Sequence, residues 1–68
     1  MNVVIEIFYI SEETKVYQAG DFPLRRRSKE EVAVDFWRQI KREMPYGAVI
    51  AKVLADGADV TDRVTALL

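Results

Sequence analysis

The residues that could do chemistry in this chain are hydroxyls, carboxylates and basic side chains, because the sequence contains neither histidine nor cysteine. Histidine is the commonest general base near neutral pH, and cysteine is a strong nucleophile. Ser11 and Ser28 therefore have no imidazole to activate them. Disulfides and the usual structural zinc sites are also excluded. We expect a protein that is not an enzyme and needs no cofactor.

Three aspartates, Asp56, Asp59 and Asp62, recur at three-residue spacing around Gly57. Oxygen-rich clusters of this kind can hold calcium. A calcium loop of the EF-hand type also needs a glycine after three ligands and a distant glutamate, and this segment has neither. Turn formation and helix capping explain the aspartates more simply, so we predict no metal site.

Most basic residues lie between positions 25 and 42, although the formal net charge of the whole chain is only -1. Such a cluster could contact phosphates, and Trp37 or Tyr46 at its margin could stack on a base. The residues that would make this nucleic-acid contact are Arg25, Arg26, Arg27, Arg38, Lys41 and Arg42.

A helix dipole explains many of the same charges without a ligand. Acidic residues near the start of a helix and basic residues near its end are the distribution that the dipole favours. Asp35 can also pair with Arg38 at three-residue spacing. Only the run 25–27 lacks such an explanation, and the net charge is far from strongly basic. Nucleic-acid binding is therefore the second of two functional hypotheses.

The first third of the chain predicts an antiparallel hairpin. Residues 2–10 (NVVIEIFYI) are dominated by β-branched and aromatic residues, which favour a strand. The polar sequence SEET follows as a turn, and KVYQAG over 15–20 predicts a second strand that ends at Gly20. Residues 21–27 form a connector, because Pro23 has no amide hydrogen to donate.

A helix is predicted from about residue 29 to residue 44. Ser28 and Glu31 have the spacing of a capping box, in which each residue satisfies an unpaired backbone amide of the other. Pro45 and Gly47 should end the helix.

The predicted helix has one broad apolar face that should lie on a sheet. Taking 100° per residue, this face contains Val32, Ala33, Phe36, Trp37, Ile40 and Met44. Val34 falls among the charged residues, and we expect it to be exposed.

The last third predicts a strand and a short final element. AVIAKVLA over 48–55 is typical of a strand, and Asp56 and Gly57 form a turn after it. Beyond this turn, Thr61 could cap a short helix with Asp62 near its positive end, or the chain could form a very short fourth strand. We favour the helix.

The order of these elements restricts the topology. A right-handed crossover through the helix should join two parallel strands and leave the first strand between them. We therefore predict a single α+β domain over residues 1–68, a ββαβ fold with a three-stranded antiparallel sheet of order 2-1-3. One amphipathic helix would cover one face, and a short C-terminal helix would follow. A ββαββ arrangement is the alternative.

The first and third strands each present two rows of side chains. In the first strand the row best placed under the helix is Val3, Ile5, Ile7 and Tyr9. Its outer row is Val4, Glu6, Phe8 and Ile10. In the third strand the row predicted under the helix is Val49, Ala51, Val53 and Ala55. Its outer row is Ala48, Ile50, Lys52 and Leu54.

The outer face is too apolar for a sheet face that meets water, since each row contains a single charge. Glu6 and Lys52 could pair there across strands. An exposed apolar patch on a small domain usually marks a contact with another protein or another copy. The predicted interface is Val4, Phe8, Ile10, Ile50 and Leu54.

We therefore predict an interaction module that forms a homodimer or small homo-oligomer, or binds another protein, through this face. The two edge strands offer a second route to association. The alternative is that the tail, through Val64, Leu67 and Leu68, folds over the face and closes it within one chain. The apolar N-terminal run is too short to cross a bilayer, so we expect a cytoplasmic protein with no membrane partner.

Overall fold

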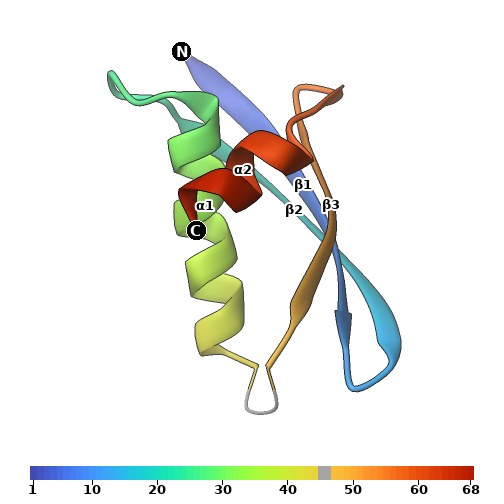
Figure 1. The fold of residues 1–68 in the computed structure, drawn as a ribbon. Helices are drawn as coiled ribbons and strands as arrows, with labels where there is room; N and C mark the ends of the chain where they lie inside the picture. The colour runs from blue at the N-terminus through green and yellow to red at the C-terminus, as the bar shows by residue number, and fades with distance from the viewer. Residues whose placement is uncertain (45–46) are drawn as a thin grey trace.

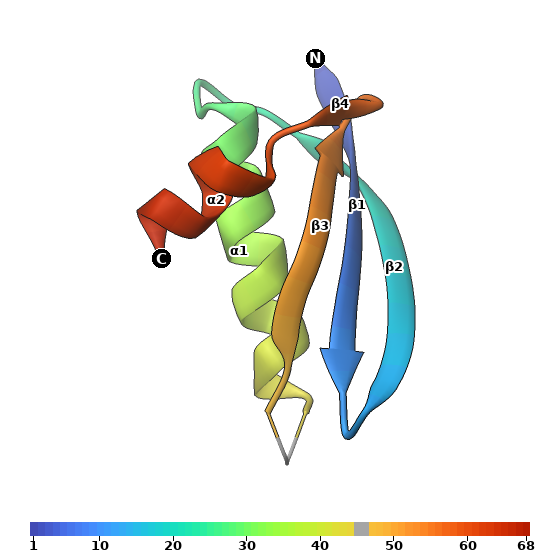
Figure 2. The same ribbon diagram turned by 45° about the vertical axis from the view of Figure 1, so that its right-hand side comes forward.

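The computed structural model describes residues 1–44 and 47–68 as four strands and two helices. The strands form one antiparallel sheet in the order β2-β1-β3-β4. Figure 1 shows β1, β2 and β3, and Figure 2 also labels the short β4. The predicted α+β fold is confirmed. The sequence left a choice between a short C-terminal helix and a short fourth strand, and the structure contains both. In chain order the elements are β1 (Asn2–Ser11), β2 (Thr14–Pro23), α1 (Lys29–Arg42), β3 (Val49–Ala55), β4 (Ala58–Asp59) and α2 (Thr61–Leu67).

The core lies between β1 and α1. The side chains of Val3, Ile5, Ile7 and Tyr9 are all at most 1% exposed, as the alternation along β1 predicts. The Tyr9 ring meets the ring of Trp37 edge-on, with 5.5 Å between the ring centroids. The residues of α1 that complete this core are Val32, Ala33, Val34, Trp37 and Ile40.

The start of α1 is fixed by the predicted capping box. The amide of Glu31 donates to Ser28 Oγ and the amide of Ser28 donates to Glu31 Oε1, both at 3.1 Å. The hydrogen bond that the Glu31 carboxylate accepts from the Ser28 backbone amide, followed by hydrogen bonding from the Ser28 side chain, lowers the pKa of Glu31. The helix ends at Arg42, two residues before the predicted end at Met44. Pro45 lies outside the described residues.

A β-bulge in β3 changes which side chains face the helices. Phe8 of β1 lies opposite Lys52, but its neighbour Tyr9 lies opposite Ile50, so Ala51 is an extra residue in the ladder. Ile50 therefore packs against the core, whereas Val49 is 68% exposed. The prediction that Val49 and Ala51 lie under the helix, with Ile50 outside, was wrong. Before the bulge, Ala48 also packs against the core.

The second helix lies beside α1 on the same face of the sheet. Figure 2 shows α2 crossing α1 on the side away from β2, and it contacts both α1 and β3. Val64 of α2 is fully buried, and Val34 of α1 is only 5% exposed. The expectation that Val34 is exposed was wrong, because α2 covers that side of α1. The alternative in which the tail closes the opposite sheet face was also wrong.

Thr61 fastens α2 to the sheet rather than capping it. Its hydroxyl accepts a hydrogen bond from the Val53 amide at 2.9 Å and donates to Asp59 Oδ1 at 2.6 Å. The N-cap position is occupied by Val60, whose side chain makes no capping hydrogen bond. The hydrogen bond from the Thr61 hydroxyl, followed by the one from its amide, lowers the pKa of Asp59.

Three tight turns use left-handed backbone angles in consecutive residues. This pattern is typical of the type I′ turn, which matches the twist of a β-hairpin and favours Asn-Gly or Asp-Gly. One of these turns has the favoured Asp-Gly sequence, whereas two contain no glycine. The turn pairs are Glu12 and Glu13 (φ 50° and 65°), Arg25 and Arg26 (47° and 67°), and Asp56 and Gly57 (49° and 84°).

Glycine at position 13 should stabilise the Glu12–Glu13 turn. In Glu13→Gly, the residue with φ 65° loses the side chain that makes this angle unfavourable. We expect the free energy of unfolding to rise by about 0.5–1 kcal/mol in urea denaturation. Lys15→Gly, within β2, is the control and should lower it. A Glu13→Gly variant less stable than the parent would contradict the turn geometry.

The docking of α2 predicts unequal effects of the same substitution at two valines. Val34→Ala removes buried methyl groups between the two helices and should lower the free energy of unfolding by about 2 kcal/mol. Val49→Ala, at an exposed position, should change it by less than about 0.5 kcal/mol. Denaturation of both variants at low protein concentration makes the comparison. Equal losses of unfolding free energy in the two variants would contradict the packing of α2 over Val34.

The capping box predicts a linked change in stability and titration. Ser28→Ala should lower the free energy of unfolding by about 1 kcal/mol. It should also raise the pKa of Glu31 part of the way towards its usual value, because alanine removes the hydroxyl but keeps the backbone amide. Because folding lowers this pKa, the stabilisation is present above the unfolded pKa of Glu31 and is lost as the pH falls through the folded one. NMR titration of the Glu31 carboxyl carbon measures the shift. A Ser28→Ala variant with unchanged stability and an unchanged Glu31 pKa would exclude a contribution from the Ser28 hydroxyl.

Candidate interaction surface

The sheet face opposite the two helices, here called the outer face, is formed by alternate residues of three strands. On β1 these residues are Val4, Glu6, Phe8 and Ile10. The antiparallel register aligns with them Asp21, Ala19, Tyr17 and Lys15 of β2. On β3 the outer face contains Val49, Lys52 and Leu54, with Ala51 in the bulge.

An aromatic pair lies at the centre of the outer face. Phe8 and Tyr17 are direct cross-strand partners, and their ring centroids are 4.8 Å apart. A shallow depression of about 190 Å³ lies beside these rings, next to Ile10 and Ala51. Val4, Ile10 and Tyr17 remain between 40% and 51% exposed. The outer face therefore presents a continuous apolar surface around Phe8.

The charged groups of the outer face do not pair as predicted. Glu6 lies opposite Leu54, whereas Lys52 lies opposite Phe8, so the expected ion pair between Glu6 and Lys52 does not form. Glu6 instead accepts a 2.7 Å hydrogen bond from the Tyr17 hydroxyl. This hydrogen bond is the main cause that raises the pKa of Tyr17, and desolvation adds to it. Lys15 and Lys52 have no ion-pair partner within the described part of the chain.

Four of the five predicted interface residues lie on the outer face, and one does not. Val4, Phe8, Ile10 and Leu54 are placed there by the register. The placement of Ile50 was wrong, because the bulge turns it towards the helices.

Sequence reasoning missed the four outer-face residues of β2, of which Tyr17 is the large aromatic one, and two outer-face residues of β3. On β3 these two are Ala51, which is the extra residue of the bulge, and Val49, which precedes it. A signal for Tyr17 was present, since a two-residue turn after Ser11 fixes a hairpin register in which Tyr17 lies opposite Phe8. Nothing in the sequence of β3 marks the bulge.

The predicted basic cluster is divided between the two ends of α1. Arg25 and Arg26 form a turn before the helix, whereas Lys41 and Arg42 lie in its last turn. The 14 residues of α1 separate the two groups by about 20 Å.

Arg27 is held by the helix rather than offered to a ligand. It forms an ion pair with Asp35 and donates to the Glu31 carbonyl at 3.1 Å. The three-residue spacing had suggested that Asp35 pairs with Arg38. In the structure Asp35 pairs with Arg27 instead. Tyr46, expected at the margin of the cluster, lies outside the described residues. Nucleic-acid contact by this cluster stays a prediction.

Both serines and two of the three aspartates considered for chemistry, Asp56 and Asp59, have structural partners. Ser11 Oγ donates to the Gly47 carbonyl at 3.1 Å, and Ser28 caps α1. Asp56 Oδ1 accepts from the Val4 amide at 2.9 Å, which ties the turn after β3 to the start of β1. No group of three acidic side chains suited to a metal ion occurs in residues 1–44 and 47–68.

Neither helix is long and apolar enough to cross a membrane, within the part of the chain that the structure describes. The searches against protein family models, curated proteins and solved structures gave no match.

Proposed function

We propose that this protein is a non-enzymatic interaction module that forms a homodimer through its outer face. The observation that carries the proposal is an apolar sheet face with Phe8 at its centre, while both helices lie on the other side. A contiguous apolar patch of this kind on a small domain is typical of a protein contact. The tail, which could have covered the face, packs against α1 instead.

The charges of the outer face suit a second copy of the same chain. Glu6 lies near the middle of β1, and Lys15 and Lys52 lie on the strands to either side. In a two-fold dimer each surface meets an identical surface, so a lysine of one copy can approach Glu6 of the other. The face is thus self-complementary in charge as well as apolar.

The size of the face predicts a dimer of moderate strength. The Cα positions of the molecule extend over 34 × 20 × 20 Å, so the rectangle of its largest side measures about 680 Å² before side chains are added. Stable complexes bury about 800 Å² on each partner, with a lower limit near 600 Å². A dimer must therefore use nearly the whole outer face. We expect a micromolar dissociation constant and strong sensitivity to a charge at the centre.

A charge placed at the centre of the face should prevent dimerisation. We expect the mass measured by light scattering to rise with concentration from 7.8 kDa towards twice that value. In Phe8→Glu and in Tyr17→Glu the mass should stay at 7.8 kDa, because a carboxylate at the centre of the contact would lose its hydration in place of an apolar ring. Of the two variants, Tyr17→Glu should affect folding less, because Tyr17 is half exposed on an edge strand.

Gln39→Glu is the matched control, since it adds the same charge to an exposed position of α1. It should dimerise like the parent. Circular dichroism checks that each variant is folded. A parent chain that stays monomeric at millimolar concentration, or folded Phe8 and Tyr17 variants that dimerise normally, would overturn the proposal.

A further inference from the structure

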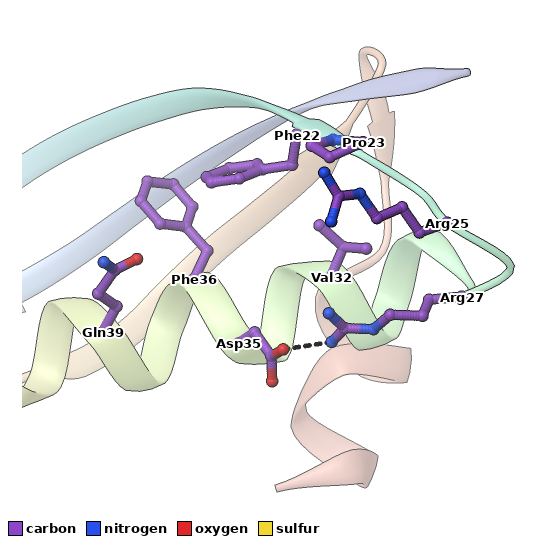
Figure 3. Close-up of a pocket in the computed structure, with 8 residues that line it drawn as sticks. All are labelled: Phe22, Pro23, Arg25, Arg27, Val32, Asp35, Phe36 and Gln39. Carbon is purple, nitrogen blue, oxygen red and sulfur yellow. Dashed lines mark hydrogen bonds and ion pairs between the residues drawn. The ribbon is translucent and has the colours of Figure 1, made fainter.

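A separate groove lies on the helix side of the sheet, between the end of β2 and α1. Its cavity of about 270 Å³ has apolar walls made by Phe22, Val32 and Phe36. Figure 3 shows the side chain of Arg25 reaching over the cavity beside Pro23, while Gln39 lies at the other end. None of these residues belongs to the outer face.

The wall formed by Phe22 depends on a glycine in β2. A Cβ atom at Gly20 would lie only 2.5 and 2.7 Å from two atoms of the Phe22 ring. The absence of a side chain at Gly20 therefore lets the ring lie back along the strand. In this position it packs against Phe36, with 4.8 Å between the ring centroids.

The groove runs beside an open strand edge. Within the described residues, β2 pairs only with β1, so its other edge has no strand beside it. The hydrogen bond from the Leu24 amide to the Met1 carbonyl, at 3.0 Å, fixes which residues of β2 bond to β1. Because this pattern alternates, the amides on the open edge are those of Lys15, Tyr17, Ala19 and Asp21.

The mouth of the groove has one available cation. Arg27 and Asp35 also line the cavity, but they form an ion pair with each other. Arg25 has no ion-pair partner among residues 1–44 and 47–68. An anionic group in the cavity would therefore meet the Arg25 guanidinium.

We propose that this groove binds the C-terminal residue of an extended peptide. The apolar side chain of that residue would fill the cavity between Phe22, Val32 and Phe36, and its carboxylate would pair with Arg25. The preceding residues would add to the open edge of β2 as a further strand. Because Arg25 follows the end of β2, the peptide runs parallel to β2. The C-terminal residue of a peptide carries an apolar side chain and a carboxylate on the same carbon atom. It therefore suits a cavity that has apolar walls and the Arg25 guanidinium in one lining.

The probe is the peptide Ac-Gly-Thr-Ser-Thr-Leu as the free acid, titrated into the ¹⁵N-labelled full chain. We expect NMR shift changes at residues 19–24 of β2 and 32–39 of α1. The same peptide with a C-terminal amide should bind about tenfold more weakly, because it loses a charge-assisted hydrogen bond. An equal affinity of the acid and amide, or no shift with millimolar acid, would overturn the proposal.

Two neighbouring arginines provide a matched pair of variants. Arg25 and Arg26 both have positive φ, which asparagine accepts readily, so either can become asparagine without strain in the turn. Arg25→Asn should weaken binding of the acid about tenfold and abolish the difference between acid and amide. Arg26→Asn should leave the affinity unchanged, since Arg26 does not line the cavity. Equal losses in both variants would show attraction by general charge only and would overturn the proposal.

The peptide site and the proposed dimer are tested independently. Phe8→Glu changes the outer face and should leave peptide binding intact, whereas Arg25→Asn should leave the mass measured by light scattering unchanged. Shift changes centred on Phe8 and Tyr17 instead of Phe22 and Phe36 would assign the peptide to the outer face and overturn the groove as its site.

Discussion

The contact between the inner row of β1 and the apolar face of α1 is the one on which the remaining structure depends. β1 has strands on both sides, and its Val3, Ile5, Ile7 and Tyr9 are buried under the helix. Once α1 occupies that position, α2 can pack against both α1 and β3 and bury Val64. The chain thereby places both helices on one side of its sheet. The apolar outer face follows directly, because a single layer of helices cannot cover both faces.

Local patterns were sufficient to predict the elements but not every side-chain direction. The capping box of Ser28 and Glu31 and the alternation along β1 are short-range signals, and both are confirmed. The bulge at Ala51 arises from the pairing of β3 with β1, and each phase of the sequence AVIAKVLA has at least three apolar residues out of four. Ile50 was therefore placed on the wrong face. Val34 was misplaced for a related reason, since its burial depends on a helix 27 or more residues further along the chain.

The two proposed surfaces use different parts of the β1–β2 hairpin, namely a side-chain face and a backbone edge. The outer face offers side chains of β1 and β2 that the helices do not reach. The groove offers the backbone edge of β2 together with Phe22, whose position depends on Gly20. Tyr17 and Phe22 lie on opposite sides of one strand, so both surfaces can be occupied at once. A dimer would then present two peptide grooves, and binding of a divalent partner would gain from the linkage.

The strand order also has a consequence for folding. The β1–β2 hairpin involves only residues 2–23, so it can form early, but an isolated hairpin is marginally stable in water. β1 gains its second neighbour only when a segment near residue 53 returns to pair with Ile7, which closes a long loop. Until that closure, β1 exposes an unpaired edge and both of its apolar rows. During synthesis from the N-terminus, this interval is when the chain is most exposed to pairing with a neighbouring nascent chain.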